Sequence, residues 1–302
     1  MTGAKGVWRW SFSGLALVVG VATVACVEVS GSGTWGHVEH EEKQFLVTGT
    51  PDIDVSTFDG SVDLRAWDRA DVLVRVEKRA ISRRAAEDIL VTTGQEGNRI
   101  TVHVKPRRWG GFLEWGDSGS AKVIVSVPRR ANVVATTGDG SIVVAGVAGT
   151  ISLQSGDGSI SGNEVSGTLK VRTGDGSIRL AAVEGQLEAG TGDGSIAVDG
   201  KLTSLRLRTG DGRVRVEAAP GSATEGEWDI TTGDGSIELA LPDGFGGELD
   251  AHTGDGRIRL DQVSISNVSG ALKDGTIRGR LGAGGRTVRV RSGDGSITFE
   301  RF

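Results

Sequence analysis

A six-residue phrase, Thr-Gly-Asp-Gly-Ser-Ile with close variants, recurs through the C-terminal half of this 302-residue chain and constrains its fold more than any other feature. Successive copies are spaced by 18, 18, 18, 18, 23, 21, 19 and 20 residues. A short, regular period of this kind is typical of a solenoid, in which each repeat forms one coil. The aspartates at the centre of the copies are Asp139, Asp157, Asp175, Asp193, Asp211, Asp234, Asp255, Asp274 and Asp294.

Apolar and polar residues alternate on both sides of each aspartate. A period of two, rich in β-branched residues, predicts short strands with one buried and one solvated face. Each repeat then holds two strands and two turns. Within the repeats, frequent Gly and the lack of a 3.6-residue period exclude helices. The third residue after each aspartate should form an inward column, which comprises Ile142, Ile160, Ile178, Ile196, Val214, Ile237, Ile258, Ile277 and Ile297.

We therefore expect an all-β chain whose residues 137–302 form a right-handed, single-stranded β-solenoid. It would have two faces, as in a β-helix or β-roll, and about nine regular coils of 18–23 residues. Residues 44–136 show strand patterns without the period, including a degenerate copy at 58–62. We expect them to form an irregular β cap and the first coils, because a solenoid end must be covered. Ser82 predicts the N-cap of one short helix there.

The N-terminus has the pattern of an export signal. Lys5 and Arg9 precede an apolar run that ends at Ala25, and the only cysteine of the chain, Cys26, follows. Residues 1–26 thus read as a signal peptide. The segment 22–26 also resembles the lipobox of bacterial lipoproteins, which implies lipidation of Cys26. A soluble protein cleaved after Ala25 and an uncleaved anchor are the alternatives. Residues 27–43 are expected to be a flexible linker.

Composition limits the functions that the chain can have. The net charge of −5 differs from the strongly basic charge that is typical of a nucleic-acid-binding protein. The single cysteine allows no intrachain disulfide. No Ser/His/Asp order, cysteine nucleophile, phosphate loop or zinc spacing occurs. We therefore expect neither an enzyme nor a cofactor. A carbohydrate-active β-helix enzyme (a polysaccharide lyase or hydrolase) is the alternative, and it would need acids that converge in one cleft.

The nine aspartates are the one candidate constellation. In a tight turn, Asp can accept a hydrogen bond from the amide two residues on, while flanking Gly residues supply positive φ. The alternative is a ladder of calcium sites, as in a β-roll. The turn opposite the aspartates carries no Asp to complete such a site. This favours turn chemistry and no bound metal.

Partner contacts are expected where the regular period fails. Trp109, Phe112 and Trp115 lie in a Gly-rich loop with two arginines, and could either contact a partner or plug the solenoid end. The longer turns at 220–228 and 242–247 are further candidates, because insertions in repeats map to loops on one edge.

The signal-like start, the step Val127–Val133 and the Gly-Asp-Gly-Ser-Ile coils together resemble a known bacterial group. These are the β-strand-repeat proteins of unknown function that carry the label "putative adhesin". The resemblance covers residues 44–302, implies a β-solenoid and supplies no catalytic residues. We expect an exported cell-envelope protein, on the periplasmic side or cell surface, held to the membrane through its N-terminus. It would be a structural or adhesion-type binding module whose partners are an envelope glycan or protein, and not nucleic acid.

Overall fold

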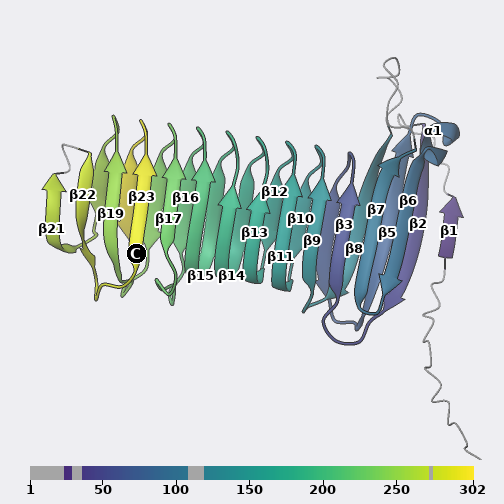
Figure 1. The fold of residues 1–302 in the computed structure, drawn as a ribbon, viewed down its shortest axis with the longest axis horizontal. Coiled ribbons are helices and arrows are strands. Elements are labelled where there is room, and N and C mark those ends of the chain that lie inside the picture. The colour runs from purple at the N-terminus through teal and green to yellow at the C-terminus, as the bar shows by residue number, and fades with distance from the viewer. Residues whose placement is uncertain (1–23, 29–35, 108–118, 272–274) are drawn as a thin grey trace, which may run out of the picture.

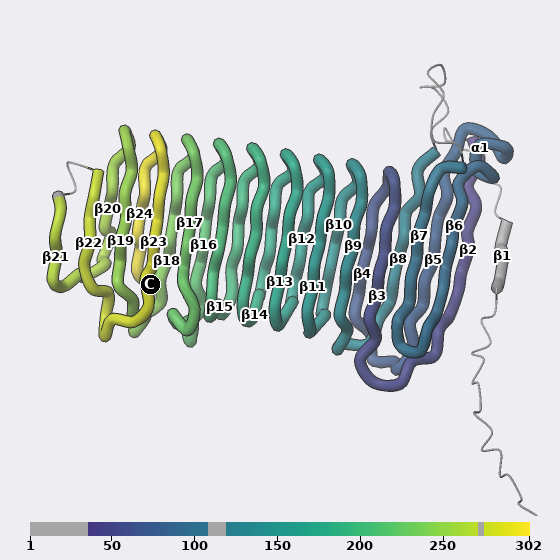
Figure 2. Tube along the Cα trace, viewed as in Figure 1, coloured from purple at the N-terminus to yellow at the C-terminus, as the bar shows by residue number. Residues whose placement is uncertain are grey.

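The computed structural model describes residues 24–28, 36–107, 119–271 and 275–302, which form an elongated stack of strands (Figures 1 and 2). These residues contain 24 strands and one short helix, so the all-β prediction is confirmed. Within them, no helix is long and apolar enough to cross a membrane.

Parallel coils with two faces form the middle of the stack. We call the face built from the strands before each aspartate turn the approach face. The face built from the strands after each aspartate turn is the exit face. Residues at the same position of successive coils lie opposite each other: Ile142 pairs with Ile160, and Ile160 with Ile178. The approach face contains β9 (Asn132–Thr137), β11 (Ala148–Ser155), β13 (Ser166–Arg172), the ends of β14 (Ile178–Gly190) and β15 (Ile196–Thr209), and β17 (Trp228–Thr232). The exit face contains β10 (Ile142–Ala145), β12 (Ile160–Asn163), the starts of β14 and β15, β16 (Val214–Ala218) and β18 (Ile237–Leu241).

The core between the faces is built from the inward columns. Ile178 is fully buried, whereas its neighbour Arg179 is exposed. All nine residues of the predicted Ile/Val column are buried, which confirms the assignment of inward and outward positions. Because every coil adds similar aliphatic side chains, the core runs as one continuous cluster along the stack.

The N-terminal end is less regular. Its strands are β2 (His37–Leu46), β3 (Asp52–Thr57), β4 (Val62–Trp67), β5 (Asp71–Ala80), β6 (Ile89–Glu96), β7 (Arg99–Pro106) and β8 (Ser120–Pro128). Helix α1 (Arg83–Glu87) begins at the predicted N-cap, where the Ser82 hydroxyl accepts a 3.2 Å hydrogen bond from the Ala85 amide. The degenerate copy forms a true coil of β3 and β4, placed between β7/β8 and β9/β10.

The prediction of a flexible linker over residues 27–43 is wrong for its last part. Strand β2 begins at His37 and pairs with β5 in antiparallel register from His37–Ala80 to Leu46–Asp71. Strand β1 (Val24–Glu28) pairs in turn with β2. The mixed His/Glu composition looked like a solvated tether. However, Lys78 of β5 is buried and lies 2.6 Å from Glu41, which stabilises the charged strand against the body.

The C-terminal end departs from sequence order. Its strands are β19 (Gly247–Thr253), β20 (Ile258–Asp261), β21 (Ile265–Ala271), β22 (Thr276–Leu281), β23 (Thr287–Ser292) and β24 (Ile297–Arg301). The C-terminal coil, β23 and β24, lies between coil β17/β18 and coil β19/β20. In Figure 1 the C-terminus therefore lies inside the stack, and β19, β22 and β21 lie beyond it.

The repeat copy around Asp274 does not add a parallel coil. Strand β22 runs antiparallel to both β19 and β21 and forms a terminal hairpin. Two of its expected inward positions are Gly270 and Gly279, so this copy brings little side-chain volume to a core. Asp274 itself lies outside the described residues.

Candidate functional site

The aspartate turns line one edge of the stack. Eight of the nine predicted aspartates lie in the described residues, and all eight are exposed. Asp59 of the degenerate copy joins them, because its turn stacks beneath that of Asp139 through the Thr137 hydroxyl, which donates to the Gly60 carbonyl at 2.8 Å. The spatial order of the turns near the C-terminus is Asp234, Asp294, Asp255, as the amides of Gly293 and Gly254 donate to Gly233 and Gly293.

The Ser or Thr hydroxyl two residues before the aspartate holds the turn at each of the eight described repeat aspartates, whereas the Thr57 hydroxyl before Asp59 has no hydrogen-bond partner. Thr209 is buried, and its hydroxyl lies 2.8 Å from the Gly194 carbonyl of the preceding coil and 3.3 Å from the Gly212 amide of its own turn. The flanking glycines are required by the close stacking of backbones. A Cβ added at Gly158 would lie 2.0 Å from the Gly140 carbonyl oxygen.

The predicted turn chemistry of the aspartates is therefore wrong in its details. In the turns that the structure describes, no aspartate carboxylate accepts a hydrogen bond, and among the described flanking glycines only Gly60 and Gly275 have a positive φ. The Ser or Thr hydroxyl replaces the carboxylate as the turn acceptor. No group of three or more His, Cys, Asp or Glu able to hold a metal occurs in the described part of the chain.

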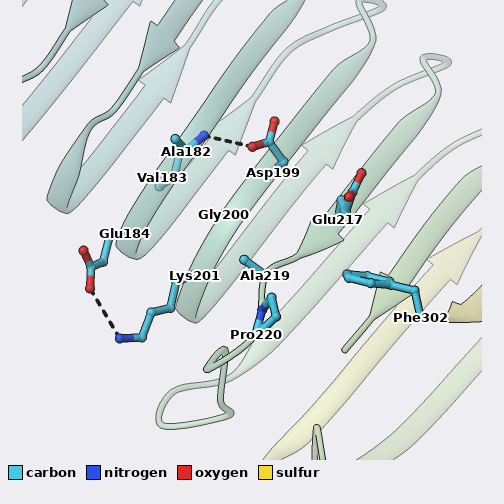
Figure 3. Close-up of a pocket in the computed structure, with 10 residues that line it drawn as sticks. All are labelled: Ala182, Val183, Glu184, Asp199, Gly200, Lys201, Glu217, Ala219, Pro220 and Phe302. Atoms are coloured by element: carbon cyan, nitrogen blue, oxygen red, sulfur yellow. Dashed lines mark hydrogen bonds and ion pairs between the residues drawn. The ribbon is translucent and has the colours of Figure 1, made fainter. Parts of the chain in front are cut away.

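A groove lies on the exit face and continues around the turn opposite the aspartates (Figure 3). It consists of two adjoining hollows of about 420 and 440 Å³ that share Asp199 and Glu217. The groove is lined largely by small side chains, so the strand surface is accessible between charged side chains. The residues that line it include Ala181, Ala197, Ala219, Arg179, Arg215 and Lys201.

Local irregularity in β14 positions the acids of the groove. Ala182 has a φ of +51°, and the register of β14 against β15 shifts between Leu180 and Val183. This turns the Ala182 amide outward, where it donates a 2.9 Å hydrogen bond to Asp199. Glu217 lies opposite Asp199 on β16 and, in the described residues, has no hydrogen bond or ion pair. The groove can therefore offer carboxylates and guanidinium groups to a polar ligand from solvent.

A row of alternating charges runs along the approach face. Arg172 lies 2.7 Å from Glu188 and holds the pKa of that carboxyl below its ordinary value. Burial alone would raise the pKa of Asp250, but hydrogen bonds from Arg291 (2.5 Å) and Arg278 (3.0 Å) hold it below its ordinary value. In spatial order, the in-register residues of the row are Lys170, Glu188, Arg206, Asp229, Arg289, Asp250 and Arg278.

The remaining predicted residues lie in different places. The backbone of Cys26 lies in β1, opposite Glu41, whereas Trp109, Phe112 and Trp115 lie outside the described residues. The two longer turns pack against the body. Their large residues Trp228 and Phe245 are buried, with ring centroids 4.9 Å apart.

Sequence reasoning missed the groove and the row of charges. The groove adjoins the register shift between β14 and β15, which the uniform 18-residue spacing of the aspartates does not reveal. The charges were visible in the sequence, but their alternation emerges only when the spatial order of the strands is known.

Comparisons place these features among known proteins. A search of the curated proteins finds no match. A solved "putative adhesin" from Parabacteroides merdae ATCC 43184 is 12% identical with a TM-score of 0.40, covering 90% of this chain and 98% of its own. One from Bacteroides fragilis NCTC 9343 is 10% identical with a TM-score of 0.38, covering 86% and 96%. A "putative cell adhesion protein" from Clostridium sporogenes ATCC 15579 is 8% identical with a TM-score of 0.27, covering 87% and 100%.

The sequence itself gives a stronger relationship. The model of one family matches residues 50–300, a range that begins just before β3 and includes every coil of the stack. The chain belongs to the Toastrack DUF4097 family.

Proposed function

We propose that this Toastrack protein is a non-enzymatic module of the bacterial cell envelope, tethered to a membrane through Cys26 and serving a structural or adhesion-type binding role. The observation that supports the proposal is the position of the first described strands, β1 and β2, in the rod. Strands β1 and β2 lie at one extreme end, and the hairpin β21–β22 at the other (Figure 1). A lipid on Cys26 would therefore attach the rod by one end and hold its long faces clear of the membrane.

The groove supports a binding role for the exposed faces. Its carboxylates and guanidinium groups are exposed, and Glu217 has no partner among the described residues, so the Glu217 carboxylate can bind a polar envelope ligand without first breaking an internal bond. Figure 3 shows one of the two hollows, with Glu184 and Lys201, 3.4 Å apart, on one side of it and Phe302 on the other. An envelope glycan or protein fits this mixture of charges and small side chains.

Labelling with a palmitate analogue tests the tether. Wild-type protein expressed in a bacterial host should incorporate the label and sediment with membranes. Cys26→Ser should lose the label and be released when the signal is cleaved or the cell is lysed. Equal labelling of the two proteins would contradict lipidation at Cys26.

Binding to isolated envelope polysaccharide and to envelope protein fractions tests the groove. A double variant Asp199→Ala/Glu217→Ala should weaken retention of the ligand at least tenfold. The matched control is Glu225→Ala/Glu227→Ala, which removes two exposed carboxylates outside the groove. Equal binding by wild type and both variants would exclude the groove as the binding surface.

A carbohydrate-active enzyme is the second candidate, because Asp199 and Glu217 lie opposite each other on neighbouring strands within one groove. Glycoside hydrolysis uses such a pair of carboxyl groups. We favour binding, since both acids are exposed and the groove is open, whereas a general acid is usually kept protonated by burial. Release of reducing sugar that is lost in Glu217→Gln would establish the enzyme instead.

A further inference from the structure

The C-terminal coil (residues 287–301) occupies an internal place in the stack although it is last in the sequence. On the approach face β23 pairs with β17 and β19, and on the exit face β24 pairs with β18 and β20. The turn hydroxyls follow the same order: Ser292 donates to the Gly235 carbonyl at 2.9 Å, and Thr253 to the Gly295 carbonyl at 2.7 Å. Strand pairing, the hydrogen bonds of the turns and core packing are therefore all compatible with the coil at this position.

Those interactions do not by themselves select this place, because every coil of a solenoid offers similar ones. The charges differ between coils. In the observed order Arg289 lies in register between Asp229 and Asp250. Stacking in sequence order would place β19 directly on β17, so that Asp250 would lie opposite Asp229. Opposite charges across neighbouring strands stabilise a sheet, and like charges destabilise it.

Further contacts strengthen this selection on the approach face. Arg291 of the C-terminal coil donates hydrogen bonds to both the carboxylate and the backbone carbonyl of Asp250. On the exit face, Arg301 of β24 lies 3.6 Å from the exposed Asp243 in the turn after β18, but Glu300 lies opposite Asp261, a pair of like charge. The preference for the interleaved order is therefore strongest around Arg289 and Arg291.

The connection that leads into the coil suits such a placement. Residues 282–286 link β22, beyond β19, back to β23, and three of these five residues are glycines with φ of +49°, +83° and +152°. The Arg286 amide at the end of this connection donates to the Thr224 hydroxyl at 3.3 Å. At the other end of the coil, the Phe302 amide donates to the Leu241 carbonyl at 3.3 Å.

We propose that the charges of Arg289 and Arg291 select the internal position of the coil formed by residues 287–301, and that this position protects the coil from unravelling. In an ordinary solenoid a coil at the edge of the stack pairs on one side only and can be removed first. Here a coil and a hairpin cover residues 287–301 on their outer side.

Disulfide trapping tests the order of the strands in the full chain. With Cys26→Ser as background, the pairs Glu238→Cys/Thr298→Cys and Arg259→Cys/Thr298→Cys lie in register on adjacent strands of the exit face, leave Arg289 and Arg291 in place, and should oxidise. Adjacent strands are about 4.8 Å apart. The pair Glu238→Cys/Arg259→Cys lies two strands apart, about 9.6 Å, which is beyond the reach of a disulfide. Oxidation of that pair alone would establish sequence order and overturn the proposal.

Limited digestion by thermolysin tests the role of the charges. Arg289→Glu places a carboxylate between Asp229 and Asp250, and should be cleaved within residues 287–301 about tenfold faster than wild type, because two attractive cross-strand pairs become repulsive. The matched control is Arg179→Glu, whose in-register neighbours Ser161 and Ala197 are neutral; it should digest at nearly the wild-type rate.

Two further measurements separate selection by charge from a general loss of folding. Arg289→Gln, which removes the attraction without adding repulsion, should be intermediate. At about 1 M salt the difference between Arg289→Glu and wild type should shrink, because the screening length falls to about 3 Å. Equal digestion of Arg289→Glu and Arg179→Glu, or a difference that salt leaves unchanged, would overturn the proposal.

Discussion

At the scale of single residues, the turn depends on a hydroxyl and on two glycines, and the aspartate is the least constrained member of the phrase. The Thr209 hydroxyl meets the carbonyls of Gly192 and Gly194 in the coil before it, at 3.2 and 2.8 Å. The Asp211 carboxylate is exposed. If aspartates on successive turns are about 5 Å apart, each pair of like charges costs on the order of 1 kcal/mol in water.

This division of roles gives the first prediction. Thr209→Val keeps the side-chain volume but leaves buried polar groups without their partner, so it should lower the free energy of unfolding by about 1–3 kcal/mol. Thr209→Ser, which keeps the hydroxyl, should cost much less. Asp211→Asn should be neutral or slightly stabilising, because it removes a repelling charge. Urea melts compare the three variants, and a larger loss in Asp211→Asn than in Thr209→Val would reverse the assignment.

At the scale of strands, β19 is held between β23 and β22 by the arginines around Asp250. The folded-state pKa of Asp250 lies below its ordinary value because hydrogen bonds from Arg291 and Arg278 outweigh the effect of burial. A carboxyl of this kind stabilises the fold above its unfolded-state pKa of about 3.9, and loses that contribution as the pH falls through the lower folded-state pKa.

The second prediction follows from the lowered folded-state pKa of Asp250. At pH 7, Asp250→Asn should reduce the free energy of unfolding by about 1–3 kcal/mol, because two charged hydrogen bonds are weakened. The difference from wild type should narrow as the pH falls from about 4 towards 2, where the wild-type carboxyl becomes protonated. Denaturant melts at several pH values measure it. A difference that stays constant down to pH 2 would mean that shape, and not charge, explains the loss.

Strand formation and burial could be predicted from the sequence because they depend on local pattern. Ile178 and Arg179 follow a period of two, and that period fixes which one is buried. The order of the coils could not be predicted in the same way. It depends on Arg289 lying in register with Asp229 and Asp250, which come from strands far away in the chain, and the uniform repeat gave no reason to depart from sequence order. The groove around Asp199 adjoins a register shift between β14 and β15 next to Ala182.

At the scale of the whole molecule, the rod is one continuous core between two solvated faces, and its stability is expected to be independent of calcium. The aspartate edge presents single exposed carboxylates, and its turns are held by hydroxyls and backbone amides.

The third prediction is that a chelator leaves the melting temperature within about 1 °C, and that millimolar calcium does the same. A ligand present at a hundredfold excess over its dissociation constant would add about 2.7 kcal/mol and would be visible in the melt. If calcium raises the melting temperature by several degrees, and Asp193→Asn removes that gain, the edge is a metal site.

Near each end of the rod one coil is placed out of sequence order: β3/β4 lies between β7/β8 and β9/β10, and β23/β24 lies between β17/β18 and β19/β20. The stack should therefore open from the hairpin and the cap that lie outside these two coils. Local opening free energies within one protein can range from near zero to the global value, and amide exchange resolves them.

Hydrogen exchange measured along the full chain by mass spectrometry tests this arrangement most directly. Amides of β23 and β24 (residues 287–301) should exchange as slowly as those of β14 and β15 in the middle of the rod, while those of the edge strand β21 should exchange fastest. If protection instead declines steadily towards the C-terminus, and residues 287–301 exchange first, the C-terminal coil lies at the end of the stack and the interleaved order is wrong.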